Sequence, residues 1–472
     1  MWEWLNETLL NFRNCFSRQS TFNWFVIIVI GLMLRSDHLG ITSIVRELNL
    51  AGNSYMTMLH FFRSTGWSML KIQSVWLNII KSSPFVIREN GKYILIGDGV
   101  KQVKEGRRMP GVKWLHQESD NSADGEYIRG HMFGALGMLI GNGTKTYSVL
   151  IFARLHAGLN ALSKWSGRQA PENSHVVQMI CDAKMVASNI GESLLLLDRL
   201  FLTAPMLQTL SQAKGLDVIT KAKSNAAAYF SPEPYKGRGA RPKKGKKIKG
   251  FELFDTHRNH FVNKQMDIYG KSKTVRYFCI DLHWGKGVYR KVRFVLTEIN
   301  GVRSALVSTD LLLSPCQIIR LYARRFKIEC SFREFKQVVA GFSYRFWSKV
   351  MPKFAMSKCN DANQTNLENI SDHHQRKQIK ATVRAIEGFV LFAVIAFGLL
   401  QLISLQFDNE INRSNFRFLR TISNNTPSER TVADYLSKYL FMLFRFFPQL
   451  SITSIIVDKQ FLPFHLFHDS SA

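Results

Sequence analysis

The chain has 472 residues, which is enough for several domains with large cores and excludes a small disulfide-stapled module. Its 63 Lys and Arg against 35 Asp and Glu give a formal net charge of +28, which favours a polyanionic partner: nucleic acid first, an anionic membrane surface second. Six scattered cysteines without a C-x-x-C pair argue against a zinc knuckle or a disulfide framework and favour a reducing cytoplasm.

Residues 1–88 have a helical pattern, and we expect them to form a region that binds DNA ends. Within it, residues 40–67 predict two helices joined by a turn at 50–53, which suits either a DNA-binding helix-turn-helix or an ordinary helical hairpin. The first residues lack the basic start and cleavage site of a signal peptide, so no export is expected.

Residues 89–224 alternate between strand and helix patterns, and we expect them to form the first part of a catalytic core. Three strands come first, including an apolar strand at 93–99 that ends in Asp98 and a hairpin at 131–155. A β-α-β-α-β series then follows, with helix 172–190, strand 193–201 reaching Asp198, a second helix, and strand 216–224.

Residues 225–312 are predicted to be a β-rich insertion that ends in a hairpin turning at Asn300-Gly301. It opens with the sequence SPEPYKGRGARPKKGKKIKG (231–250), whose eight Lys and Arg stand among glycines and prolines. This polybasic loop is either a DNA contact or a solvated linker. Its candidate DNA-binding residues are Lys243, Lys244, Lys246 and Lys247.

A helix that closes the catalytic core is predicted within 313–345, followed at 346–472 by a helical region for DNA contact or dimerisation. Residues 388–407 form a run of twenty without a charge, long enough to span a bilayer. Its glutamines and serine weaken the apolar signal, so we interpret it as a buried helix, with a membrane span as the alternative.

One face of the closing helix carries four polar residue types. At about 100° per residue, Tyr322, Arg325, Glu329 and Lys336 fall within roughly 60° of one another. A neighbouring apolar stripe contains Leu321, Ile328, Phe332, Phe335 and Val339. The alternative is a solvated charged helix, but the alignment of the four beside a core stripe favours a functional face.

Three acids are candidates for a catalytic cluster: Asp98, Asp198 and Glu329. If the strands that carry the two aspartates pair in parallel, both emerge at one sheet edge, where the helix can turn Glu329 inward. Clustered carboxylates need cations, and hard oxygen ligands select Mg²⁺ or Mn²⁺; two such ions can activate a nucleophile and stabilise the leaving oxygen of a phosphodiester. Asp281 also follows an apolar run, but we interpret it as structural because it lies in the insertion.

The four aligned residues have the spacing Y-x2-R-x3-E-x6-K, which resembles the YREK signature of DDE transposases from bacterial insertion sequences of family four. The neighbourhoods are similar too, with GDG around Asp98, RRMPGVKWLH at 107–116 and DRLF at 198–201. The resemblance covers residues 90–340. It implies a ribonuclease H-like mixed α/β sheet, flanked by helices, with a β-rich insertion, and two divalent metal ions held by Asp98, Asp198 and Glu329.

The resemblance also implies cutting at inverted-repeat ends of double-stranded DNA, joining of the 3′-hydroxyls to target DNA, and a homodimer on paired ends. Tyr322, Arg325 and Lys336 would then contact DNA, and Trp284 is the candidate for an aromatic that holds a flipped base, with a core tryptophan as the alternative. Arg199 could touch phosphate. His116 and His131 suit either the mouth of the active site or a structural role.

Three alternatives stay open at this stage: a ribonuclease H-like nuclease or resolvase without strand transfer, a non-enzymatic basic protein that coats nucleic acid or a membrane, and an inactive genomic relic. We expect a cytoplasmic protein associated with the nucleoid through DNA.

Overall fold

The computed structural model describes residues 1–117, 126–156, 162, 174–234, 237, 239–268, 270–353, 370–412, 414, 420 and 425–461. The N-terminal region is helical, as predicted. Its helices are α1 (Trp2–Leu10), α2 (Gln19–Leu34), α3 (Ile41–Glu47), α4 (Ser54–Arg63) and α5 (Met69–Lys81). The pair α3 and α4 confirms two helices joined by a turn within 40–67.

Thirteen strands of the described residues join into one mixed sheet. They are β1 (Arg88–Glu89), β2 (Lys92–Val103), β3 (Lys113–His116), β4 (Tyr127–Gly141), β5 (Thr146–Leu155), β6 (Ser193–Leu196), β7 (Leu216–Lys221), β8 (Ala227–Tyr229), β9 (Lys247–Lys249), β10 (Val262–Ile268), β11 (Lys271–Trp284), β12 (Arg290–Ile299) and β13 (Val302–Ser308). The main path runs β3-β4-β2-β6-β7-β13-β12-β11-β8-β9. Strand β6 pairs in parallel with β2 and β7, and the remaining pairs are antiparallel. The prediction of a mixed α/β sheet is confirmed.

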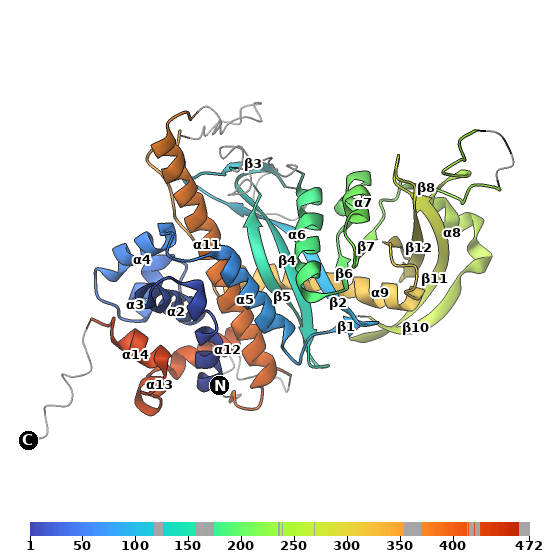
Figure 1. Cartoon of the computed structure of the whole chain (residues 1–472). Helices are drawn as coiled ribbons and strands as arrows, with labels where there is room; N and C mark the ends of the chain where they lie inside the picture. The colour runs from blue at the N-terminus through green and yellow to red at the C-terminus, as the bar shows by residue number, and fades with distance from the viewer. Residues whose placement is uncertain are drawn as a thin grey trace, which may run out of the picture.

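Helices connect and cover the strands (Figure 1). Between β5 and β7 lie α6 (His175–Ile190) and α7 (Ala204–Ser211), and a short α8 (Leu253–Thr256) follows β9. After β13 come α9 (Pro315–Ala323) and α10 (Lys327–Gln337), then α11 (His373–Gln406), α12 (Glu429–Lys438), α13 (Leu440–Phe446) and α14 (Ser451–Val457). Helix α6 packs on β2 and β4, whereas α10 and α11 pack on β5.

The two ends of the chain meet around α2, which contacts α11, α12 and α14. The blue and red helices therefore share one end of the molecule, and the β-rich segment lies at the other (Figure 1). That segment has a core of its own beside the main one, built around Phe254, Leu282 and Phe294. Because β13 pairs with β7, the segment continues the central sheet. Its identity as an insertion in a ribonuclease H-like core stays a prediction.

Helix α11 contains residues 388–406 of the uncharged run and is buried from Gly388 to Leu405. Among the described residues, α11 is the single helix that is long enough and apolar enough to cross a membrane. Its most apolar stretch, however, is wholly buried inside the protein. The bent pair α13 and α14 passes the same test of length and composition only if it is taken as one span. The polar residues of the run have protein partners: Gln401 donates to Glu429, and Ser404 lies 2.8 Å from the Tyr147 hydroxyl.

Three predicted boundaries are wrong. Strand β2 continues past Asp98 to Val103 because β4 supplies hydrogen bonds along its whole second half. Strand β6 ends at Leu196, where its parallel pairing with β2 and β7 ends, and a 3-10 turn follows at Arg199–Phe201. The closing helix is two helices, α9 and α10, separated by a 3-10 turn at Arg324–Phe326. Short 3-10 stretches inside helices often mark functional positions.

Candidate active site

The register of the two central strands aligns the two candidate aspartates. Ile96 of β2 pairs with Leu196 of β6, and this pair is the last in their parallel ladder. Asp98 and Asp198 each stand two residues beyond it. Parallel strands carry equivalent positions to the same edge, so both carboxylates belong to the end of this ladder, as the sequence predicts.

Asp98 faces the side of the sheet that lies opposite α6. A Cβ added at Gly97 would lie 2.6 Å from the sulfur of Met179, and one added at Gly99 would lie 2.9 Å from Nε2 of His175, and both of these side chains belong to α6. Alternate residues of a strand point to opposite faces. The two glycines let α6 pack closely, and Asp98 between them is turned toward Arg325.

The helical segment after β13 brings a cation and the third acid to Asp98. Nη1 of Arg325 lies 3.4 Å from Oδ2 of Asp98, and its Nη2 donates to Oε1 of Glu329. The Arg325 side chain is 14% exposed, that of Asp98 21% and that of Glu329 40%. One guanidinium therefore ties an acid of the sheet to an acid of the helix.

The pKa of Asp98 shows that all three acids share one electrostatic environment. Burial raises the pKa of its carboxyl to about 6, the charge of Arg325 and the backbone N–H of Gly99 oppose this rise, and the charges of Asp198 and Glu329 add to it. Like charges raise a carboxyl pKa only when they are near. Asp98 and Glu329 share the Arg325 guanidinium, and the charge of Asp198 acts on the same Asp98 carboxyl. That the three acids form a catalytic site stays a prediction.

The donor set of this cluster suits a hard divalent cation, since it consists of carboxylate oxygens. No group of three His, Cys, Asp or Glu in the described part of the chain is arranged so that it could hold a metal ion. The positive charge of Arg325 instead lies between Asp98 and Glu329. The residues fit a metal by their chemistry, and the ion pairs show that the cluster draws a cation toward it.

A comparison with protein families finds one match. Residues 144–350 match the family described as the transposase DDE domain. Over these residues, which make up less than half of the chain, the protein is similar to that family. This is a catalytic family that cleaves DNA and transfers its strands, generally with divalent metal ions. The matched residues include Asp198 and Glu329, whereas Asp98 lies before the matched segment. Asp98 is connected to this segment because its strand, β2, pairs with β6. A search of the curated proteins finds no match.

Two further residues of the predicted polar face lie beside Arg325, Asp98 and Glu329. Tyr322, at the end of α9, is half-buried and close enough to affect the pKa of Arg325. Nζ of Lys336 lies 3.5 Å from the carbonyl oxygen of Lys101 on β2. The apolar stripe of the same segment is buried, as predicted, at Leu321, Ile328, Phe332, Phe335 and Val339.

The other residues that we predicted to contact DNA differ in how far they are exposed. Arg199 is exposed directly after Asp198. Trp284 is half-buried at the end of β11 and packs against both hydrophobic cores. The four candidate lysines of the loop are exposed, and Lys244 donates to the Tyr289 hydroxyl at 3.1 Å. Their contacts with DNA stay predictions.

Asp281, which we interpreted as structural, and His116 and His131, whose roles the sequence left undecided, each have a partner within the protein. Asp281 accepts two hydrogen bonds from Arg293 opposite it in the β11–β12 ladder, at 2.9 and 3.3 Å. His131 is fully buried between the Tyr344 hydroxyl, 2.6 Å from its Nδ1, and the carbonyl oxygen of Pro110, 3.0 Å from its Nε2. His116 is at the surface beside Glu126. Asp281 and His131 therefore serve the fold.

The structure also shows a segment that we did not single out in the sequence. Residues 340–350, here called the strap, follow α10 and cross to the N-terminal helices. A predicted domain boundary at 345 divides it. Its residues 342–349 alternate strictly between buried and less buried positions in the structure. The sequence FSYRFWSK does not show this alternation, because a tryptophan stands in the less buried row and a serine in the buried one. The strap forms no strand, and so a strand-based interpretation would have misplaced it.

Proposed function

We propose that this protein is a DNA transposase that cuts DNA at the ends of a mobile element and joins the freed 3′-hydroxyls to target DNA. Two observations support the proposal. Asp98 and Asp198 each stand two residues beyond the last pair of the β2–β6 ladder, and Arg325 contacts both Asp98 and Glu329. Residues 144–350 of the same chain match the transposase DDE domain. The YREK spacing supports a relation to the insertion sequences of family four.

Asp98, Asp198 and Glu329 would hold the divalent ions, Mg²⁺ or Mn²⁺. When bound, such ions lower the pKa of an attacking water or hydroxyl and stabilise the charge on the leaving oxygen. Arg325 balances Asp98 and Glu329, and its planar fork also suits a phosphate. Lys336 and Tyr322 flank the cluster, so they would position the DNA backbone beside it.

The rest of the molecule would supply binding. A net charge of +28 gives strong, salt-dependent attraction to DNA. The helices α3 and α4 would contact the transposon ends, and the exposed lysines of the polybasic loop would contact phosphates. Trp284 would serve a flipped base only if the half-buried ring became accessible. We further propose a homodimer on paired ends and a cytoplasmic location on the nucleoid.

The proposal is tested with Asp98→Asn, Asp198→Asn and Glu329→Gln on a plasmid that carries the DNA flanking the reading frame on both sides. Each change removes a carboxylate ligand while nearly keeping its shape. We expect each to lower Mg²⁺-dependent cleavage by about a thousandfold or more, because several kcal/mol of transition-state stabilisation depend on the ions. DNA binding should persist in all three.

Asp281→Asn is the matched control, since Asp281 is also an acid on a strand but is held by Arg293. It should cut like the wild type. Near-normal cleavage by any of the three acid variants would remove that acid from the site. A pre-cleaved end separates the alternatives: strand transfer supports a transposase, and cleavage without joining would mean a nuclease or resolvase.

A further inference from the structure

The strap presents two rows of side chains in opposite directions. Its inner row is buried and includes Tyr344, Phe346 and Ser348, whereas its outer row is exposed and includes Arg345, Trp347 and Lys349. This alternation is that of an extended chain. Trp347 is 50% exposed, which is unusual for a tryptophan, because this side chain is normally well buried.

The inner row fixes the strap firmly to the protein. Nζ of Lys104 donates to the carbonyl oxygens of Phe342 and Tyr344 and lies 3.7 Å from the centre of the Tyr344 ring. The Tyr344 hydroxyl is held by His131, and the Phe346 ring packs against Phe62 of α4. The outer row is therefore displayed by a rigid backbone, as a binding site requires.

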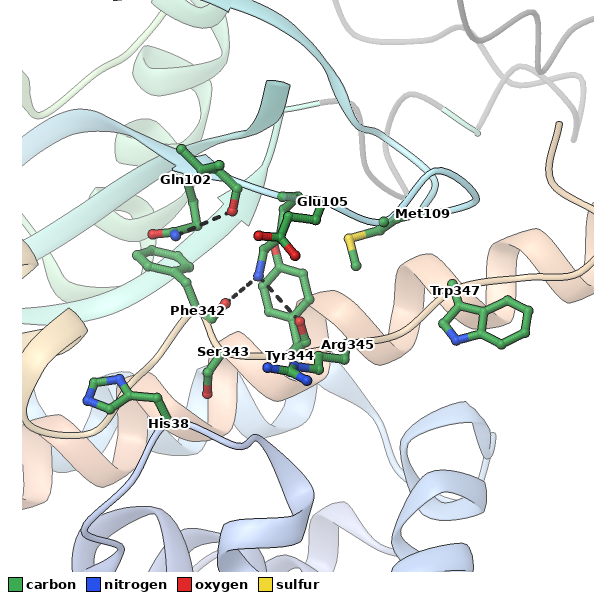
Figure 2. Close-up of a pocket in the computed structure, with 12 residues that line it drawn as sticks. His38, Gln102, Glu105, Met109, Phe342, Ser343, Tyr344, Arg345 and Trp347 are labelled. Atoms are coloured by element: carbon green, nitrogen blue, oxygen red, sulfur yellow. Dashed lines mark hydrogen bonds between the residues drawn. The ribbon is translucent and has the colours of Figure 1, made fainter. Parts of the chain in front are cut away.

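A groove of about 680 Å³ runs beside this outer row (Figure 2). One wall is the end of β2 with Gln102, and the other is the strap with Arg345 and Trp347. His38 of the N-terminal region closes it on one side. A second hollow of about 300 Å³, lined by residues of α3 and α4, adjoins the first because Arg345 lines both.

The groove leads away from the active site along β2. Asp98 and Gln102 lie on the same strand, four residues or about 13 Å apart. Between them, the carbonyl oxygen of Lys101 is 3.5 Å from Nζ of Lys336. A strand of DNA held at the three acids would therefore meet the groove a few nucleotides away.

The charge and chemistry of the groove match a nucleic acid. Arg345 and Lys349 are exposed, and Nη2 of Arg63 lies 3.5 Å from the carbonyl oxygen of Trp347. The residues that line the groove include one acid, Glu105. An exposed indole beside cations is the arrangement that binds single strands, with bases stacked on the ring and phosphates on the cations. Stacked, paired bases of a duplex cannot offer a face to this ring.

We propose that the groove between the end of β2 and the strap binds single-stranded DNA, the unpaired strand that extends from the cleavage site, with a base stacked on Trp347 and phosphates on Arg345 and Lys349. This inference rests on the proposed function for its biological substrate. The binding itself is measurable on any single strand.

The test measures binding of the full-length protein to an oligothymidylate of about 20 nucleotides and to a duplex of equal length, by fluorescence anisotropy. Trp347→Ala should weaken single-strand binding by about five- to a hundredfold, the loss of one stacked base, and leave duplex binding within about twofold. Trp347→Phe should keep most of the affinity. Arg345→Ala should reduce the salt slope of single-strand binding by about 0.7.

Arg445→Ala and Phe446→Ala are matched controls, because they remove an exposed cation and an exposed aromatic from α13, outside the groove. Both should bind like the wild type. Three results for Trp347→Ala would overturn the inference. They are an unchanged affinity for the single strand, an equal loss of affinity for the duplex, and a loss of self-association of the protein in place of a loss of DNA binding. A wild-type protein that fails to cleave DNA but shows the Trp347-dependent single-strand affinity would instead refute the proposed function alone.

Discussion

At the residue scale, Arg325 explains how acids from a strand and a helix coexist in a partly buried site. Its guanidinium contacts both Asp98 and Glu329, so its single positive charge offsets part of their combined negative charge. We predict that Arg325→Ala lowers the free energy of unfolding by about 1–2 kcal/mol in chelator, a modest figure because Glu329 is 40% exposed and screened by solvent. Mg²⁺ or Mn²⁺ should stabilise this variant more than the wild type.

Thermal unfolding with and without metal measures both effects of Arg325→Ala. Arg324→Ala is the control, since Arg324 belongs to the same 3-10 turn and has similar exposure. Equal stability of Arg325→Ala and wild type in chelator would show that the guanidinium does not balance the acids.

His131 gives the fold a defined sensitivity to acid. Burial, helped by the charges of Lys104 and Lys113 and opposed by the hydrogen bond to Pro110, lowers the pKa of its imidazole from 6.5 to about 3. Between these pH values the unfolded chain holds a proton that the folded chain does not, so stability falls as the pH drops below 6.5. The loss between pH 6.5 and 5 should be about 2 kcal/mol.

His131→Asn tests this sensitivity by urea denaturation at pH 7.5 and pH 5. The variant should be less stable at pH 7.5 by about 1–3 kcal/mol, because it loses buried hydrogen bonds, but its stability should change less between the two pH values. His116→Asn, at the surface, should behave like the wild type at both. An unaltered pH dependence in His131→Asn would assign the acid sensitivity to other groups.

At the element scale, α11 depends on a glycine for its contact with α5 and β5. A Cβ at Gly398 would lie 2.2 Å from Cζ2 of Trp76, and that indole is fixed by a 2.9 Å hydrogen bond to the carbonyl oxygen of Leu150. Gly398→Ala should therefore destabilise the protein by about 1–3 kcal/mol through overpacking, although alanine favours the helix. Gly52→Ala, where a Cβ meets nothing within 4 Å, should change the urea midpoint little.

The helices and strands show which features of the fold the sequence could predict and which it could not. Apolar runs predicted the two strands that lead to Asp98 and Asp198, because burial on both faces leaves a continuous hydrophobic signal. Their parallel pairing, which the sequence offered only as a condition, comes from the structure. The end of β2 was missed because it is set by hydrogen bonds to β4, which leave no mark in residue type. The break between α9 and α10 was missed because the apolar period of Leu321, Ile328 and Phe332 continues through it.

At the scale of the whole molecule, the central sheet connects segments that are far apart in the sequence. Strand β13 pairs with β7, so the polybasic loop belongs to a segment built onto the same sheet as β2, which bears Asp98, and β6, which leads to Asp198. The sequence predicted the loop and the acids separately. Their connection through one sheet required the long-range pairing of β13, which no local pattern specifies.

The polybasic loop gives the last prediction. Replacing Lys243, Lys244, Lys246 and Lys247 together with glutamine should lower the slope of log affinity against log salt for duplex DNA by up to about 0.9 per lysine that contacts a phosphate. The matched control replaces four exposed lysines elsewhere, Lys71, Lys184, Lys214 and Lys377, and removes the same charge. Because released counterions report local contacts, whereas net charge acts diffusely, the loop variant should lose more slope than the control. An equal loss would mean that the loop adds only to the overall field that draws DNA to the protein.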